Sequence, residues 1–250
     1  MRILFLFLLL ILLNPAKAQV VNIESLRSFV DTNGFHGVEN LNVDYRRNTR
    51  ELLTLTNNLT LKYQNKRHVL LFLNTLDIQL ANSTVLEQTS FFHLRYNYRQ
   101  TERLAYEVFA QYQRNIPLRI DPRILVGLGP RYKIITGGKF IANAGLLGMY
   151  EYDDESGNDT IHRDYRISTY LTLGYQGGDR FRWMNFLYYQ PRVDKFEDYR
   201  INLQSQLSVV IIKGLSFVTT VNFRYDTFPV VDPAIPDLTL TWINGLAYRF

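Results

Sequence analysis

Histidine is the residue type most open to a catalytic reading in this 250-residue chain, which contains His36, His68, His93 and His162. A serine hydrolase built on a strand needs a serine two residues from its histidine, so that both side chains share one face. None of the four histidines has such a serine, and Ser90 lies on the face opposite to His93. We therefore predict no catalytic residues, while a lipid or ester hydrolase that uses His93 stays open as a rival hypothesis.

The acidic segment Asp153 to Asp159 is the best candidate for metal ligands. Its carboxylates are oxygen ligands of the kind that calcium takes, but the spacing of a calcium loop is missing. A solvated acidic loop is the simpler interpretation. Gly127-x-Gly129 and Gly137-Gly138 are not followed by a predicted helix, so we interpret these glycines as structural rather than as phosphate loops. The sequence predicts no metal site and no cofactor.

The composition excludes several classes of protein. The chain is 46% hydrophobic and 20% charged and has no cysteine, which is not typical of disorder or of a disulfide scaffold. The formal net charge is +5, but no basic run or aromatic-basic motif accompanies it. We therefore predict no nucleic-acid partner.

Residues 1–18 have the features of a cleaved secretory signal. Arg2 precedes an apolar run from Ile3 to Leu13, and Ala16-Lys17-Ala18 matches a small-x-small cleavage site. The run is too short to cross a hydrocarbon layer of ~30 Å as a helix. No later window approaches eighteen consecutive apolar residues, so an exported soluble domain and a membrane β-barrel are the two classes left to compare.

The chain after the signal alternates apolar and polar residues almost from end to end, which indicates strands. Twelve such runs are predicted, at 35–45, 52–63, 68–80, 89–99, 103–113, 123–133, 139–152, 164–175, 180–190, 198–211, 215–226 and 238–250. Most have the ~9 to 11 residues of a tilted membrane strand, whereas strands of soluble sheets cluster near ~5 to 6. We predict an all-β fold: a closed antiparallel transmembrane β-barrel of about twelve strands over residues 35–250, after a periplasmic segment at 19–34.

The connections between these runs support the same fold. An even strand count places both chain ends on one side, and the connections on that side are tight. Most connections on the other side are longer: Ala81 to Gln88, Arg114 to Pro122, Asp153 to Arg163, Pro191 to Glu197 and Thr227 to Asp237. Short turns on one side and long loops on the other are typical of bacterial outer-membrane barrels.

Folding the runs into hairpins predicts which residues lie opposite each other. Pro130 lies inside a predicted strand and removes a hydrogen-bond donor, so we expect a bulge there. The predicted opposed pairs include Leu61 with Leu70, Arg95 with Glu107, Arg123 with Glu151 and Leu207 with Val221.

Charged residues occupy one face of the predicted strands. A lipid-facing Arg or Lys at the membrane midplane costs about 2 to 4 kcal/mol, so we expect the charged face to line the lumen. The principal lumen residues are Arg95, Glu107, Arg123, Arg131, Glu151, Arg166, Arg200, Arg224 and Arg249, joined by Asp44, Lys62, Asp77, Lys139 and Asp226. These are nine bases and five acids, a surplus that favours anions if the lumen conducts.

The opposite face ends repeatedly in tyrosine, which is typical of the aromatic girdles at membrane interfaces. These residues are Tyr45, Tyr63, Tyr98, Tyr150, Tyr175, Tyr225 and Tyr248. The end of the chain, Tyr248 and Phe250, resembles the aromatic signal by which the barrel-assembly machinery recognises its substrates. We thus expect a protein held in outer-membrane lipid, with its acyl chains against the apolar face.

Residues 93–98, 107–115 and 123–132 resemble a family of salt-induced outer-membrane proteins, a domain of unknown function in Gram-negative bacteria. The resemblance extends over most of the mature chain and implies an outer-membrane barrel. The family has no established activity, catalytic residues or cofactor, and "salt-induced" describes its expression.

The leading hypothesis is a non-enzymatic envelope protein that forms a narrow, weakly anion-preferring channel linked to the osmotic or salt response. One alternative is a purely structural protein, in which pairs such as Arg95 with Glu107 form an internal ladder that holds the wall. The other is the hydrolase considered above.

Overall fold

One antiparallel sheet makes up almost all of the structure, a computed structural model that describes residues 33–47, 51–82, 84–135, 137–155, 160–178, 180–213, 215–229 and 236–248. Its strands follow each other in chain order. They are β1 (Gly34–Arg47), β2 (Glu51–Asn65), β3 (His68–Ala81), β4 (Thr84–Arg99), β5 (Leu104–Asn115), β6 (Ile120–Ile135), β7 (Phe140–Glu155), β8 (Thr160–Gly177), β9 (Phe181–Pro191), β10 (Tyr199–Ile212), β11 (Leu215–Asp226) and β12 (Leu238–Tyr248), with a short 3-10 helix, η2 (Ile116–Leu118), after β5. Each predicted run coincides with one strand.

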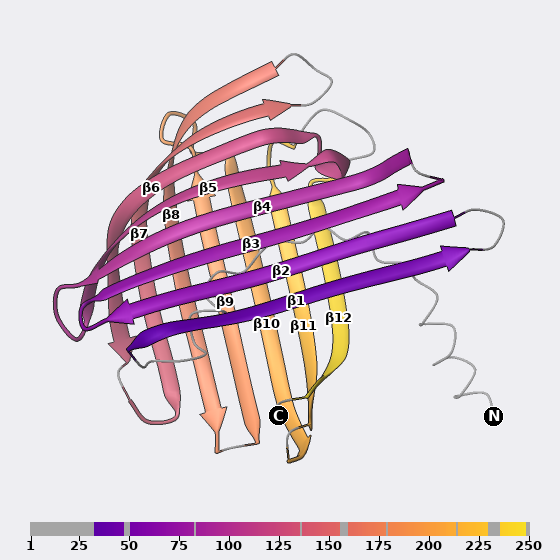
Figure 1. The fold of residues 1–250 in the computed structure, drawn as a ribbon. Coiled ribbons are helices and arrows are strands. Elements are labelled where there is room, and N and C mark those ends of the chain that lie inside the picture. The colour runs from indigo at the N-terminus through magenta and orange to yellow at the C-terminus, as the bar shows by residue number, and fades with distance from the viewer. Residues whose placement is uncertain are drawn as a thin grey trace, which may run out of the picture.

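The sheet coils strongly around an interior. In Figure 1, β9–β12 pass behind β1–β4 and cross them at a steep angle. Side chains from β4 through β11 line one common internal cavity, so the wall curves round on itself. The described pairings run from β1–β2 to β11–β12 and include none between β1 and β12, so closure stays a prediction. Among the described residues, no helix has the length and apolarity to span a membrane. The predicted signal, most of the segment at 19–34, Arg249 and Phe250 lie outside the described residues.

The hairpin registers predicted from the sequence are wrong by two residues. The turn between β2 and β3 is Lys66-Arg67, one residue later than expected. Lys66 adopts the left-handed backbone (φ 50) that two-residue hairpin turns favour. Because the side-chain period in a strand is two, the error leaves every residue on its predicted face. The observed pairs are Leu61 with Phe72, Arg95 with Phe109, Arg123 with Asp153 and Leu207 with Thr219.

Three predicted loops are largely strand. In the connection expected at Arg114 to Pro122, β5 continues to Asn115 and β6 begins at Ile120, with η2 between them. The connection expected at Ala81 to Gln88 is a tight turn, because β4 begins at Thr84. The loop expected at Asp153 to Arg163 is also shorter, because β7 continues to Glu155 and β8 begins at Thr160. Basic partners on neighbouring strands explain how acidic residues enter this strand end, since Asp153 pairs with Arg123 on β6. The longer connections that remain lie at 192–198 and 227–237.

The bulge expected at Pro130 is absent from the described pairing of β6 and β7. Leu128 pairs with Gly148 and Arg131 with Gly145, so the register is the same on both sides of the proline. A Cβ atom on Gly129 would collide with the backbone at Leu146, which shows how closely the two strands approach here. The register shifts instead near the two ends of β6.

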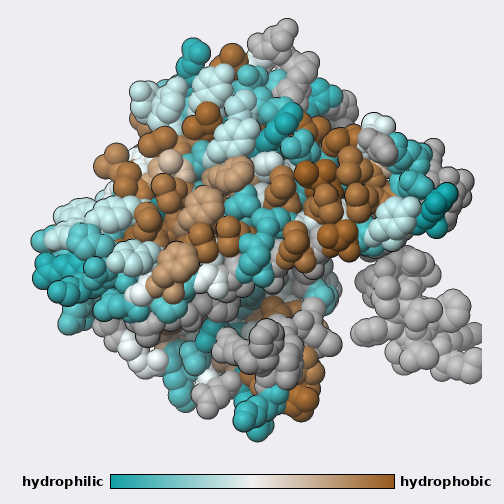
Figure 2. Space-filling view, in the orientation of Figure 1, coloured by the Kyte–Doolittle hydropathy of each residue, from teal (hydrophilic) through white to brown (hydrophobic). Residues whose placement is uncertain are grey.

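The two faces of the wall differ as the alternation predicts. On β8, Asp164, Arg166 and Tyr170 are buried inside, whereas Tyr165 is 67% exposed on the outer face. Tyr165 and Tyr175 mark the two ends of that face. Ten residues at ~3.3 Å, tilted by about 40°, span about 25 Å, the height of the apolar band of outer-membrane barrels. Figure 2 shows this band crossing the middle of the molecule, with hydrophilic residues at both ends.

Neighbouring aromatic rings extend both ends of the band from strand to strand. At the loop side, Tyr150 lies 5.4 Å from Tyr165 and Tyr199 lies 6.1 Å from Tyr225, measured between ring centroids. At the turn side, Tyr175 contacts the rings of both Phe140 and Phe181. The side chain of Tyr248 lies outside the described residues, although its backbone ends β12.

Candidate functional site

Inward alternation brings the predicted lumen residues together inside the sheet. Five are buried, namely Arg95, Glu107, Arg123, Glu151 and Arg166, while Arg131, Arg200 and Arg224 are half-buried. Of the additional predicted residues, Lys62 and Asp226 are buried and Asp77 is half-buried, whereas Asp44 is exposed and Lys139 is exposed in the turn before β7.

Glu151 on β7 is the centre of an ion-pair network near the loop side. Its carboxylate is fully buried and accepts hydrogen bonds from Arg166 Nε (2.6 Å) and Arg200 Nη1 (2.5 Å). Arg123 Nε lies 3.0 Å from its Oε1 atom. These arginines come from β8, β10 and β6, so a single carboxylate ties together strands that are not all neighbours. The predicted pair of Arg123 with Glu151 is therefore part of a larger network, in which three arginines share one carboxylate.

Further acidic residues extend this network toward the loops. Asp153 accepts from Arg123, and Asp226 accepts from Arg200 Nε at 2.9 Å. Asp198, at the end of the connection 192–198, accepts from Arg166 Nη2 at 2.9 Å. The inner wall thus holds this loop through charge-assisted hydrogen bonds, which are stronger than neutral ones.

Arg192 also belongs to that loop. It donates to Asp198 at 3.3 Å and, through two nitrogens, to Asp194. The hydrogen bonds from Arg192 lower the pKa of the exposed Asp194 carboxyl below its ordinary value.

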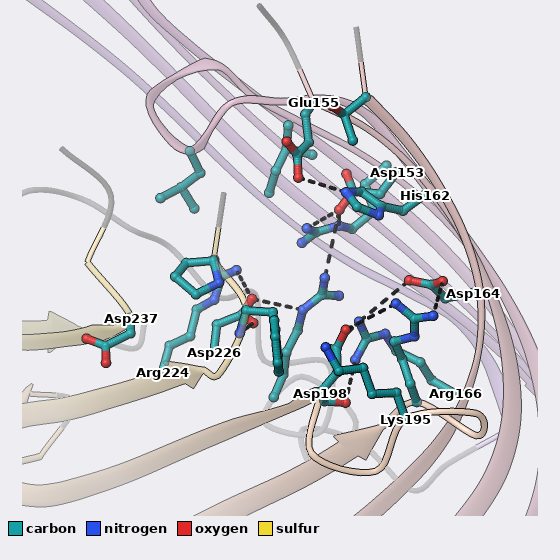
Figure 3. Close-up of a pocket in the computed structure, with 18 of the residues that line it drawn as sticks. Asp153, Glu155, His162, Asp164, Arg166, Lys195, Asp198, Arg224, Asp226 and Asp237 are labelled. Carbon is teal, nitrogen blue, oxygen red and sulfur yellow. Dashed lines mark hydrogen bonds and ion pairs between the residues drawn. The ribbon is translucent and has the colours of Figure 1, made fainter. Parts of the chain in front are cut away.

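A cavity of about 480 Å³ opens where this network meets the loops. Figure 3 shows carboxylates and guanidiniums converging on it from the surrounding strands and connections. Six of its lining residues are basic and six are acidic: Arg123, Arg166, Arg192, Lys195, Arg200 and Arg224, and Asp153, Glu155, Asp164, Asp198, Asp226 and Asp237. We call this space the loop-side cavity.

The interior narrows below the loop-side cavity. A space of about 120 Å³ continues inward and shares Arg123, Arg200 and Arg224 with it. Its walls include a buried apolar cluster, which we call the waist: Phe109, Leu125, Leu147, Met149, Tyr170 and Tyr188. Sequence reasoning missed the waist, because it assigned the inner face to polar residues. Gly127 and Gly145, on the inner face of adjacent strands, are the signal that could have shown where bulky rings fit.

A second set of contacts crosses the interior at the waist. Glu107 on β5 accepts from Arg95 Nη1 (3.0 Å) and from the hydroxyl of Tyr170 (2.9 Å). Tyr170 stands on β8, so this hydrogen bond reaches across β6 and β7. A side chain on Gly145 would overlap the ring of Tyr170, and one on Gly127 would overlap the ring of Phe109. Glycine at these two positions makes room for the rings.

The turn side of the interior holds another cavity, of about 470 Å³. Its lining carries five bases, Lys62, Arg99, Arg103, Arg131 and Lys133, and one acid, Glu102. We call it the turn-side cavity. In contrast to the balanced loop-side cavity, its surface charge is strongly positive.

His93 is buried on the inner face of β4, and both of its ring nitrogens have hydrogen-bond partners. Its Nε2 accepts a hydrogen bond from Arg95 Nε at 3.2 Å, so Nδ1 carries the proton and faces Gln111 Oε1 at 3.1 Å. The ring also stacks on Phe109. A histidine with both nitrogens used in this way does not offer a base to a serine.

The acidic segment shows one contact of His162, whose Nε2 lies 2.9 Å from Glu155 Oε1. The described residues contain no group of three histidine, cysteine or acidic side chains arranged to hold a metal ion. Positions 156–159 of that segment lie outside the described residues.

One protein family and two porins of known structure resemble this chain. The family described as "Protein of unknown function, DUF481" matches residues 40–250. The NanC porin superposes with a TM-score of 0.50 over 85% of this chain and 99% of its own, at 7% identity. The KdgM porin gives a TM-score of 0.46 over 85% and 99%, at 12% identity. No curated protein matches the chain. The likeness to the NanC porin shows a shared porin-like, all-β antiparallel fold.

Proposed function

The chain belongs to the DUF481 family of proteins of unknown function, and we propose that it is a non-enzymatic outer-membrane β-barrel whose interior forms a narrow, weakly anion-preferring passage. The observation that carries this proposal is the pair of cavities at opposite ends of one charged interior, separated by the waist.

Location in the outer membrane is supported by the two faces of the wall. The outer face carries an apolar band with tyrosines at its ends, and most charged residues of β4–β8 are buried or half-buried, whereas the exposed Glu87 and Arg163 lie toward the loop-side ends of their strands. In the proposed barrel, β12 joins β1, so that no backbone donor or acceptor faces lipid. Residues 1–18 are the export signal, the segment 19–34 lies in the periplasm, and Tyr248 with Phe250 engages the assembly machinery.

Preference for anions follows from the charges along the passage. The loop-side cavity has equal numbers of bases and acids, and buried ion pairs hold most of them. The turn-side cavity has five bases to one acid. A narrow opening lined by one sign of charge favours the opposite ion. Because only one end is strongly charged, we expect the preference to be weak.

Planar-bilayer recording of the purified protein tests the proposal. We expect small channel events and a reversal potential, in a potassium chloride gradient, shifted toward that of chloride. The double variant Arg103→Glu, Lys133→Glu changes the turn-side cavity and should shift the reversal potential toward potassium. Lys139→Glu is the matched control, because Lys139 is exposed in the same turn region but does not line the cavity. Absence of any conductance above that of the protein-free bilayer would contradict the proposal that the interior is a passage.

A structural role is the second candidate, and the waist favours it. Apolar rings and the contact between Tyr170 and Glu107 fill the middle of the interior. In that case the unaltered protein conducts nothing, while its removal weakens the envelope and makes cells sensitive to detergent. A link to salt rests on the family resemblance, and growth of a deletion strain at high salt tests it.

A further inference from the structure

A row of polar side chains crosses the otherwise apolar outer face of the wall. It consists of Glu39, Asn57, Asn74, Asn185, Ser205, Thr219 and Asn244, which we call the polar row. Each member lies four to eight residues from the turn-side end of its strand, so the members share a similar depth.

Strand pairing places the row on the outer face. Glu39 and Asn74 both pair with Leu59, one of the outward leucines of β2. Asn185 pairs with Ser205, and Thr219 pairs with Asn244. Alternation gives the same result, because Asn185 lies between the exposed Trp183 and Leu187, and Asn244 follows the exposed Trp242 by two residues.

The rest of the wall is different at this depth. The outward residues of β4–β7 within the same distance of the turn side are Phe92, Leu94, Val108, Ala110, Tyr112, Leu128, Pro130, Ala144, Leu146 and Gly148. Tyr112 is the one member of this set whose side chain has a polar group. Polar groups are therefore most numerous on β9–β12 and β1–β3, which form one continuous side when β12 joins β1. Thr169 on β8, next to β9, adds a hydroxyl at the border of this side. Lipid surrounds a barrel uniformly, so lipid alone does not explain this asymmetry.

Glu39 is the strongest member of the row. Among the described residues it is the one charged side chain on the outer face at this depth. Asn57 Nδ2 donates a hydrogen bond to its carboxylate. A carboxylate can accept several more, and acyl chains offer no donor. Ionisable groups at membrane depth face a protein partner or water rather than lipid.

We propose that this side of the barrel binds a second copy of the same chain within the membrane, an inference that rests on the proposed outer-membrane location. Side-chain amides both donate and accept hydrogen bonds, so a row of asparagines is complementary to an identical row. A two-fold interface brings one patch against itself and needs this property. In such a dimer, an asparagine of the second copy supplies the further donor that Glu39 lacks in lipid.

Cysteine cross-linking in outer-membrane vesicles tests the interface, because the natural chain has no cysteine. Asn57→Cys, Leu41→Cys and Asn244→Cys sample three positions along the polar side. Leu128→Cys is the matched control, since Leu128 is 66% exposed on the apolar side of the wall. With a mild oxidant, we expect a disulfide-linked dimer from at least one polar-side variant and none from the control. Equal cross-linking from both sides, no cross-linking, or a product with a different protein would each overturn the proposal.

The mass of the purified protein in detergent provides an independent measurement. We expect the unaltered chain to have twice the protomer mass, and Glu39→Leu with Asn57→Leu to have the protomer mass. An unaltered protein that is already monomeric, or a variant that stays dimeric, contradicts the inference.

Faster migration of the unheated protein on a detergent gel separates the two proposals. If that shift is missing, the barrel itself is wrong. If the shift is present and the protein is monomeric, the barrel stands and only the interface is wrong.

Discussion

The ring of Tyr170 occupies the space that a side chain on Gly145 would need. The glycine is on β7 and the tyrosine on β8, and both face the interior. This fit lets the tyrosine hydroxyl reach Glu107 on β5, which in turn holds Arg95. The geometry of the waist therefore depends on a residue without a side chain.

Gly145→Val should destabilise the protein by forcing Tyr170 out of its place. Overpacking of a filled interior costs about 1 to 3 kcal/mol, and the contact with Glu107 is lost as well. The temperature at which the protein loses its fast migration on a detergent gel measures this effect. Gly148→Val is the control, because a side chain there meets nothing within 4 Å on the outer face. Equal loss in both variants would contradict the role assigned to Tyr170.

Tyr170→Ala should widen the waist and raise single-channel conductance several-fold. The ring is part of the apolar cluster between the two cavities, so its removal opens space between them. Tyr170→Phe keeps the ring and loses only the hydroxyl, and we expect its conductance to stay near that of the unaltered protein. If alanine and phenylalanine have the same effect, the ring does not set the width.

The strands and their faces could be predicted from the sequence because one rule governs both. A wall with an apolar outer face and a polar inner face requires alternation, and a two-residue error in register does not change the face of any residue. Arg123 illustrates this: it was expected opposite Glu151 and pairs with Asp153, yet it contacts both carboxylates. Long arginine side chains reach diagonal neighbours, so the predicted contact of Arg123 with Glu151 forms although the predicted register is wrong by two residues.

The waist could not be predicted from alternation, because its apolar residues occupy positions expected to be polar. Leu147 and Met149 lie on the inner face of β7, where only neighbours from distant strands give them a partner. The outward position of Glu39 was missed for a similar reason. One polar residue among apolar ones on the same face does not change the periodicity from which the faces were predicted. Both are exceptions to the alternation, so neither is found by a search for periodicity.

Glu151→Ala should lower stability strongly, since it leaves Arg123, Arg166 and Arg200 without their shared acceptor. Removing one partner from a buried ion network costs on the order of 3 to 5 kcal/mol. Glu51→Ala is the matched control: its pair with Arg47, at 3.4 Å, lies at the exposed loop side and should be worth below about 1 kcal/mol. Urea unfolding of the two variants in the same detergent gives the comparison. A small loss for Glu151 would show that the three arginines find other partners.

Asp198→Ala should release the connection 192–198 from the inner wall. Asp198 accepts from Arg166 and Arg192, and its backbone carbonyl accepts from Arg192 N at 2.9 Å. With the carboxylate gone, the loop keeps backbone contacts such as that of Val193 N with Tyr165 O, and the pair of Arg192 with Asp164. The two strongest side-chain contacts to the wall are lost, so we expect faster cleavage by an added protease in intact cells. Asp194→Ala removes another of the three acidic partners of Arg192, but Asp194 is exposed and does not contact the wall, so cleavage should change little. Faster cleavage in both variants would place the anchor in Arg192 itself. No change in either would show that the backbone contacts and the pair of Arg192 with Asp164 are enough to fix the loop.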